Sequence, residues 1–279
     1  MVPTMADFLI LGCGYTGQRV AARLLARGLP VTVTTRHPES LAELAAAGAR
    51  VVELDLLRED DWTQLDELVV PGTRLLHSLP VLRTAGGERL EITPRLMARL
   101  AAGRRVARVV YLSTTGVYGD ATQVDARSHA VPVDAIGRLR VAAEQAVMAG
   151  PWRALVLRAA AIYGPGRGMF AGEPLPAGAG QHVVSRIHVD DLAAHAEAGL
   201  LGEVTGAFPV ADELPAPTLE LALYRARLRG EPPPAAESAA AGRTRRPSPG
   251  RRVDGSAIRA ALGIQLQYRT YREAFGRKA

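Results

Sequence analysis

The feature that most constrains the fold of this chain is an apolar run that breaks into three glycines, Phe8-Leu9-Ile10-Leu11-Gly12-Cys13-Gly14-Tyr15-Thr16-Gly17. The run predicts a strand, and the G-x-G-x-x-G spacing predicts a tight turn into a helix. Gly12 permits the sharp exit, Gly14 lets the backbone approach a pyrophosphate, and Gly17 lets the helix pack on the strand. The free N–H groups at the start of that helix favour an anion. Such a turn alone is weak evidence, but the β-branched run 29–35 follows the helix and completes a βαβ unit.

The composition is typical of a soluble globular protein. Of 279 residues, 48% are hydrophobic and 22% are charged, which allows one large domain or two modest ones. No apolar run approaches the roughly 20 residues that span a bilayer, and no basic segment precedes the first strand. We therefore expect a cytoplasmic protein without membrane contacts. The single cysteine, Cys13, excludes intramolecular disulfides and cysteine-based metal sites, and we expect it to be a small loop residue rather than a catalytic thiol.

The net charge of +6 could suggest a nucleic-acid partner. Nearly all the basic residues are arginines spread along the chain, and Lys278 is the sole lysine. We therefore do not expect nucleic-acid binding, and we expect some of the arginines to face an anionic cofactor or substrate instead.

Strands and helices alternate through the first 160 residues. The expected strands are 8–11, 29–35, 49–55, 74–79, 106–112 and 154–158, and the helices between them end at Gly28 and Gly48, begin near Asp60, and cover 91–102 and 137–148. This alternation predicts an α/β fold, a doubly wound parallel sheet with helices on both faces.

The chain becomes loop-rich after Tyr163. A helix is expected from the 187–192 segment to about Leu201, with Asp190 or Asp191 as its N-cap. The remaining expectations are a strand at 207–211, a helix at 219–228, a mobile surface loop at 230–252 and a last helix at 255–262.

Four motifs, in this order, resemble those of the extended short-chain dehydrogenase/reductases, the NAD-dependent epimerase/dehydratase family. They are the glycines at 12–17, Ser113-Thr114-Thr115-Gly116-Val117-Tyr118-Gly119, the segment 157–166 (LRAAAIYGPG) and Ile187-His188-Val189-Asp190-Asp191-Leu192. The terminal Val253-Asp254-Gly255-Ser256 is similar to that of the smaller, atypical members. The resemblance implies a Rossmann domain at 1–160 that carries the dinucleotide. A small C-terminal substrate lobe at 161–279 would be packed on it and partly interleaved.

The resemblance also assigns cofactor contacts by position. Asp55 would accept a hydrogen bond from the adenine amine, and Leu79 and Pro80 would lie against the adenosine or ribose. His188 and Asp190 are expected to lock the two lobes together rather than to catalyse. The full set of expected cofactor residues is Gly12, Cys13, Gly14, Tyr15, Thr16, Gly17, Arg36, Asp55, Leu79, Pro80 and Arg140.

Arg36 lies about twenty residues beyond the glycine turn, where an acidic residue would bind the ribose 2′-hydroxyl of NAD. Thr34, Thr35 and His37 flank it, and no acid occurs before Glu39. The position therefore favours NADP, with NAD as the alternative. A solvated arginine at the end of a strand is the other interpretation.

The chain departs from the family at its Tyr-x-x-x-Lys pair, because Ile136 stands at the tyrosine and Arg140 at the lysine. Isoleucine cannot transfer a proton, whereas arginine could still grip the nicotinamide ribose. Thr114 falls where a family hydroxyl polarises the substrate, although it could instead bond only to neighbouring backbone. We therefore name Thr114 and Arg140 as the catalytic candidates. Tyr118 and Tyr163 are the remaining phenols near the cleft, and we expect both to pack in the substrate lobe.

These residues leave three functional hypotheses. The first is an NAD(P)-dependent oxidoreductase or epimerase/dehydratase-like enzyme that acts on a small polar carbonyl or alcohol, such as a nucleotide-linked sugar. The second is a catalytically degenerate NADP-binding sensor or regulatory protein. The third, ranked last, is an RNA-binding protein that uses the arginines of 243–252. A homodimer is compatible with the sequence.

Overall fold

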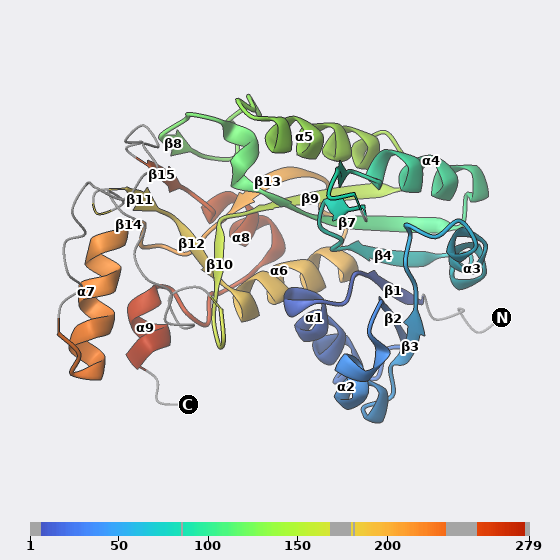
Figure 1. The fold of residues 1–279 in the computed structure, drawn as a ribbon, viewed down its shortest axis with the longest axis horizontal. Coiled ribbons are helices and arrows are strands. Elements are labelled where there is room, and N and C mark those ends of the chain that lie inside the picture. The colour runs from blue at the N-terminus through green and yellow to red at the C-terminus, as the bar shows by residue number, and fades with distance from the viewer. Residues whose placement is uncertain (1–6, 85, 168–179, 181, 233–249, 277–279) are drawn as a thin grey trace.

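A seven-stranded, all-parallel sheet forms the centre of the computed structural model, which describes residues 7–84, 86–167, 180, 182–232 and 250–276 (Figure 1). Across the sheet the strands are β13 (Gly206–Val210), β9 (Arg153–Ala159), β7 (Val106–Thr114), β4 (Thr73–His77), β1 (Phe8–Leu11), β2 (Val31–Thr35) and β3 (Arg50–Glu53). This order confirms the expected α/β Rossmann fold.

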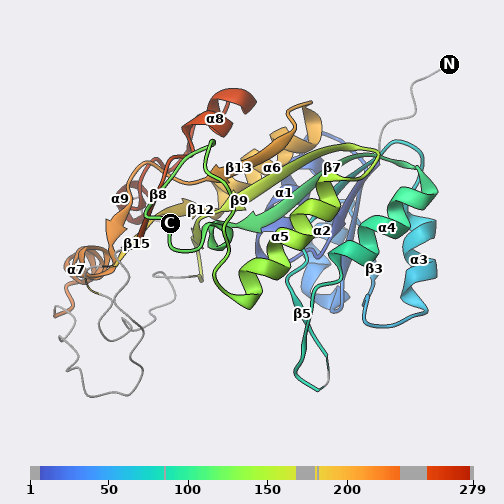
Figure 2. The same cartoon turned by 90° about the horizontal axis from the view of Figure 1, so that it is seen from above.

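Helices cover both faces of the sheet (Figure 1), and the two helical layers are seen on either side of it in Figure 2. One face carries α1 (Tyr15–Leu25), α2 (Ala42–Ala46) and α6 (Val189–Leu201), and the other carries α3 (Asp61–Leu68), α4 (Thr93–Gly103) and α5 (Ala135–Met148). Side chains alternate along each strand, so Phe8 and Ile10 enter one core while Leu9 and Leu11 enter the other. The central strand β1 is buried on both faces and is apolar throughout, whereas β2 and β3, toward one edge of the sheet, include polar residues.

A smaller lobe lies beyond one end of the sheet, at the left of Figure 1. It contains a mixed sheet in the order β14-β11-β15-β8, the pair β10 and β12, and the helices α7 and α9. The bounds are β8 (Gln123–Val124), β10 (Ala161–Tyr163), β11 (Val183–Val184), β12 (Arg186–His188), β14 (Ala216–Pro217), α7 (Thr218–Arg229), β15 (Gly250–Val253), α8 (Ser256–Leu262) and α9 (Tyr271–Gly276). The remaining elements are the hairpin β5 (Leu82–Arg83) and β6 (Arg89–Leu90) and the 3-10 helices η1 (Pro38–Leu41) and η2 (Thr115–Tyr118).

The chain crosses between the two parts more than once. β8 leaves the first part to pair with β15, whereas α6 and β13, from beyond residue 160, complete the large sheet and its helical layer. The buried Glu197 carboxylate connects α6 to α1 and the residues just after it. One of its oxygens lies 2.6 Å from Arg23 Nε, and the other lies 2.6 Å from Arg27 Nε. The division into two domains at residue 160 stays a prediction.

Three expectations for the C-terminal third were wrong. The N-cap of α6 is His188, whose Nδ1 accepts the N–H of Asp190 at 3.2 Å, so neither aspartate is the cap. α8 is not the last helix, because α9 follows it and buries Tyr271. The expected surface loop ends in a strand, β15, while 233–249 lie outside the described residues.

No helix within the described ranges has the length and apolar composition needed to cross a bilayer.

A buried carboxylate ties the C-terminal segment to the large sheet. Asp191, in the first turn of α6, accepts the N–H of Gln267 at 2.7 Å and that of Tyr268 at 3.0 Å. Its side chain is almost fully enclosed, and burial raises its pKa while the two N–H donors oppose the rise. The second aspartate of the Val-Asp-Asp motif is therefore a structural anchor.

We expect Asp191→Ala to lower the free energy of unfolding by about 3 kcal/mol, because two backbone N–H groups lose a charged acceptor that is itself buried. The neighbouring Asp190→Ala removes a half-exposed pair with Arg19 and should cost below about 1 kcal/mol. Urea unfolding followed by circular dichroism measures both, and tryptic cleavage at Arg269 should accelerate only in Asp191→Ala. Equal costs for the two variants would contradict the anchor.

Candidate functional site

The glycine turn is held between two neighbouring strands. Gly12 adopts φ +82°, and a Cβ there would lie 2.8 Å from the Leu79 Cδ2 atom. The Gly12 N–H donates to the Thr34 Oγ1 atom at 3.2 Å, and the Cys13 N–H donates to the Thr34 carbonyl at 2.8 Å. Only glycine therefore fits at position 12, for reasons of both backbone conformation and space.

The other two glycines meet different surroundings. A Cβ on Gly17 would lie 3.2 Å from the Gly12 carbonyl oxygen and from Ile10 Cγ2, which shows how closely α1 packs on β1. A Cβ on Gly14 would meet no atom within 4 Å. Gly14 is the N-cap of the eleven-residue α1 and offers no side-chain cap. The first N–H groups of α1 thus face open space beside Gly14, which suits phosphate oxygens.

A cavity of about 270 Å³ lies beside this turn. It is lined by the turn, the end of β2 and the segments that follow β3 and β4, because the carboxyl ends of parallel strands share one edge of the sheet. Seven of the expected cofactor residues meet here: Gly12, Cys13, Gly14, Arg36, Asp55, Leu79 and Pro80. The sequence analysis did not identify several lining residues, such as Gln18 and Ser78. Gln18 could have been identified, because it lies one helical turn after Gly14.

Arg36 is exposed at the end of β2 and lines this cavity. Within the described part of the chain, its guanidinium makes no hydrogen bond or ion pair. The nearby Glu39 carboxylate instead lies 3.6 Å from His37 Nδ1, and both of those side chains are well exposed. A cation that is unpaired among the described residues therefore lies at the wall of the cavity, at the end of β2.

Asp55 follows β3 and is half-buried. Its Oδ1 atom accepts the N–H of Leu57 at 3.1 Å, and its own N–H donates to Asp61 Oδ2 at 2.6 Å. These two bonds fix the loop and hold the Asp55 carboxylate at the cavity wall.

Three expected cofactor residues of the turn, Tyr15, Thr16 and Gly17, do not line the cavity. The Tyr15 hydroxyl donates to the Pro165 carbonyl at 3.0 Å, and its ring lies between the guanidiniums of Arg19 and Arg167. Tyr15 therefore connects the glycine turn to the segment after β10.

Thr114 is placed where β7 ends and η2 begins, and it is half-buried. Its Oγ1 atom accepts the N–H of Gly116 at 3.1 Å, so the hydroxyl caps the short helix and keeps its own hydrogen for another acceptor. The helix is also held from the small lobe. The Arg251 guanidinium donates to the carbonyls of Thr115, Gly119 and Ala121, the last at 2.9 Å.

Next to Thr114, a buried ionic network occupies the opposite face of β7. Ser113 Oγ donates to Glu144 Oε1 at 2.5 Å, and Arg158 Nη2 lies 2.8 Å from Glu144 Oε2. Arg158 Nη1 donates to the Tyr118 hydroxyl at 3.1 Å. Burial raises the pKa of Tyr118, and Arg158 opposes the rise. As expected, Tyr118 is a packing residue, and so is the buried Tyr163.

The two residues expected at the positions of the family pair, Ile136 and Arg140, lie one turn apart on α5. Ile136 is 38% exposed. Arg140 Nη1 donates to the Tyr111 hydroxyl at 2.7 Å and lies 3.7 Å from Glu91 Oε2. The structure gives Nε and Nη2 of Arg140 no partner among the residues it describes.

Beneath Arg140, Tyr111 stacks on His77 with ring centroids 4.8 Å apart, and His77 Nε2 lies 2.7 Å from Thr93 Oγ1. Burial raises the pKa of Tyr111 to about 12 and lowers that of His77 to about 3. Both groups are therefore neutral near pH 7.

The β12–α6 junction joins the lobes, as expected for His188 and Asp190. Asp190 pairs with Arg19 of α1 at 2.9 Å. The His188 ring lies against Tyr268, with centroids 3.9 Å apart, and meets the edge of Tyr163. Burial lowers the pKa of His188, although Asp190 opposes the change.

Residues 8–205 match the model of a family described as the NAD dependent epimerase/dehydratase family. Two curated relatives cover nearly the whole chain. Protein YeeZ of Escherichia coli K12 is 30% identical over 95% of this chain and 97% of its own. A 3-diazoavenalumate denitrifying reductase from a Streptomyces species is 29% identical over the same shares.

Solved structures show the same fold. A conserved protein of unknown function from Silicibacter pomeroyi is 32% identical, with a TM-score of 0.76 over 97% of this chain and 96% of that one. MoeE5, in complex with UDP-glucose and NAD, is 24% identical with the same TM-score and coverage.

We expect Cys13 to resist alkylation in the folded protein, because its side chain is buried and burial raises the pKa of its thiol to about 12. A maleimide should label it only after denaturation. The chain has no other cysteine, so one mass increment reports the reaction. Complete labelling of the native protein at the rate seen in denaturant would show that the turn opens.

Proposed function

The chain belongs to the NAD-dependent epimerase/dehydratase family, and from this premise we propose that it is an NADP-dependent oxidoreductase or epimerase-like enzyme. Its substrate would be a small polar carbonyl or alcohol of the nucleotide-sugar type. The observation that carries the cofactor assignment is the free guanidinium of Arg36 in the cavity beside the glycine turn. A 2′-phosphate offers that guanidinium a charge-assisted, bidentate contact.

The residues of the cavity fit a dinucleotide. The start of α1 would take the pyrophosphate, Asp55 the adenine amine, and Leu79 with Pro80 the adenosine. Arg140 would reach the nicotinamide ribose through Nε and Nη2, because its Nη1 is already held by Tyr111 and Glu91. A bound NADP would supply hydride-transfer chemistry to the substrate.

Thr114 is the residue that we propose to polarise the substrate. Its hydroxyl accepts from Gly116, so the free hydroxyl hydrogen can donate to a substrate oxygen. No residue yet named supplies the proton that a tyrosine would provide, because Ile136 cannot and the nearby phenols are bonded to arginines. The reaction would then draw its proton from solvent or substrate.

The names of similar proteins support this choice of substrate and chemistry. MoeE5 was solved with UDP-glucose and NAD, which supports a nucleotide-linked sugar. The Streptomyces relative is named as a reductase, which supports the oxidoreductase side of the proposal.

A cofactor-binding sensor without turnover is the second candidate. The observation that favours it is Ile136 at the position of the family's proton donor, with Arg140 held in a buried ion pair.

We expect Arg36→Ala to weaken NADPH binding by roughly ten- to hundredfold, because a hydrogen bond to a charged group contributes about 1.5–3 kcal/mol. NADH binding should change little, since it lacks the 2′-phosphate. Isothermal titration with both cofactors measures this preference. Wild-type protein that binds NADH and NADPH equally, or a variant with an unchanged preference, would reject the assignment.

Two matched variants sharpen this titration. Arg50→Ala removes an exposed arginine at the far end of β3 from the cavity and should leave both affinities unchanged. Gly14→Ala has room for its methyl in the protein, so stability should be retained. The methyl would occupy the space of the pyrophosphate, so both cofactors should bind more weakly.

We expect Thr114→Val to lower kcat on UDP-glucose or UDP-glucuronic acid by roughly 10²–10³-fold, because the substrate oxygen loses its hydrogen-bond donor. NADPH affinity should stay unchanged. Thr114→Ser keeps the hydroxyl and the cap of η2 and should retain most of the rate. Equal rates for Thr114→Val and wild type would remove Thr114 from the chemistry, and a wild type that binds NADPH without turnover of a broad substrate panel would favour the sensor.

A further inference from the structure

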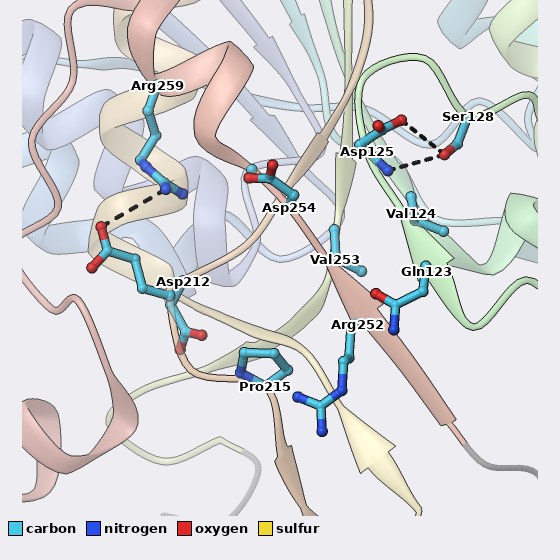
Figure 3. Close-up of a pocket in the computed structure, with 12 residues that line it drawn as sticks. Gln123, Val124, Asp125, Ser128, Asp212, Pro215, Arg252, Val253, Asp254 and Arg259 are labelled. Carbon is cyan, nitrogen blue, oxygen red and sulfur yellow. Dashed lines mark hydrogen bonds and ion pairs between the residues drawn. The ribbon is translucent and has the colours of Figure 1, made fainter.

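A second cavity, of about 570 Å³, lies in the small lobe (Figure 3). Its walls are the loop after β8, the segment after β13, and the junction of β15 with α8. It shares no lining residue with the cavity beside the glycine turn. Three of its residues, Val253, Asp254 and Gly255, come from the Val-Asp-Gly-Ser motif, for which the proposed function has no use.

Arg252 brings an uncompensated positive charge to this cavity. Neighbouring residues of a strand point to opposite sides, so Arg251 faces the turn after Thr114 while Arg252 lines the cavity. Its exposed guanidinium has no hydrogen bond or ion pair in the part of the chain that the structure covers, and Figure 3 shows it beside Pro215. The other arginine, Arg259, is already held by the Ala211 carbonyl at 2.9 Å and by Glu213 at 3.8 Å.

Asp212 brings a buried carboxyl group to the wall. Its side chain is 2% exposed, and Oδ1 accepts the N–H of Leu214 at 3.2 Å. Oδ2 is buried as well, and the Tyr163 hydroxyl is bonded to this carboxyl group. Burial raises the pKa of Asp212 to about 7, while Arg186 and Tyr163 oppose the rise. A cation at the cavity would therefore favour its ionised form.

Two further carboxylates surround the cavity. Asp254 is exposed and accepts the Ser256 N–H at 2.8 Å through Oδ1. Asp125 is bonded to Ser128 and lies 3.3 Å from Arg127. Among the described lining residues, four are carboxylates and two are arginines, and of these two only Arg252 has no ion pair there.

We propose that this cavity binds a small zwitterion with a primary ammonium and a carboxylate, an α-amino acid or a short peptide. Arg252 takes the carboxylate and the exposed Asp254 takes the ammonium, near the buried carboxyl group of Asp212. The ligand satisfies both signs of charge, which a simple anion or a diamine would not.

The lining residues also favour this zwitterionic ligand over a nucleotide. The residues described around the cavity include no aromatic side chain on which a nucleobase could stack. The volume exceeds that of a single small amino acid, which leaves room for a large side chain or a second residue.

Isothermal titration of the full chain with each standard L-amino acid, and with glycylglycine, tests the proposal. We expect at least one of them to bind. Its N-acetyl and methyl ester derivatives, which remove the ammonium and the carboxylate charge in turn, should bind roughly ten- to hundredfold more weakly. Free amino acids and the dipeptide are separate arms, so the experiment also identifies which of the two is preferred.

Arg252→Ala and Asp254→Asn should each weaken the bound ligand by a similar factor, and asparagine retains the acceptor for Ser256. The matched controls Arg50→Ala and Asp60→Asn change exposed residues elsewhere and should have no effect. NADPH affinity should be the same in all four variants. A result that contradicts the proposed function would therefore not change the interpretation of the amino-acid titrations. The absence of binding by every probe, or binding that neither Arg252→Ala nor Asp254→Asn weakens, would overturn the proposal.

Discussion

The close approach of Gly12 to Leu79 is the constraint on which the cofactor half of the molecule depends. A Cβ at Gly12 would lie 2.8 Å from the Leu79 side chain, so the ends of β1 and β4 can come together only around a glycine. The bonds from Gly12 and Cys13 to Thr34 then fix the end of β2 to the same turn. With three strand ends held in register, the residues just beyond them must gather at one edge, and the cavity beside Arg36 follows from that geometry.

The other half of the cleft is organised by buried ion pairs between β-strand ends and α5. Glu144 with Arg158 and Glu91 with Arg140 are both largely enclosed, so loss of one partner would leave a charge without compensation. The two departures from the family pair are physically consistent with each other. With Ile136 at the expected position of the tyrosine, there is no phenol whose pKa a lysine ammonium would have to lower. An arginine can therefore stand at the expected position of the lysine. Its planar guanidinium bonds Tyr111 through Nη1, and its other nitrogens have no partner among the described residues.

The structural features that could be predicted from the sequence are those whose signal lies within a few neighbouring residues. Buried strands such as 106–112 and the amphipathic helix 91–102 were found because periodicity and glycine stops are written within a few residues. The short strands of the small lobe were missed, since two-residue strands such as β11 exist only through pairing with distant segments. The His188 cap was missed because an aspartate is the commoner choice, and here Asp191 is needed for the tail instead. Within the site, the turn and Arg36 could be located from spacing, whereas the partners of Arg140 depend on contacts across β7 and α5 that no spacing reveals.

Strand β15 of the small lobe contacts the turn that begins at Thr114. It pairs with β11 and β8, and a Cβ at Gly250 would lie 2.0 Å from the Val183 carbonyl oxygen, so the backbones of β15 and β11 approach closely. From this position Arg251 donates to three carbonyls of the turn that begins at Thr114, and it thereby sets the position of the proposed catalytic hydroxyl. Arg252 leaves the same strand toward the second cavity. The placement of Thr114 therefore depends on a strand from the opposite end of the sequence, which gives a physical reason for the interleaving of the two lobes: the loop-rich C-terminal region is part of the framework that holds the site.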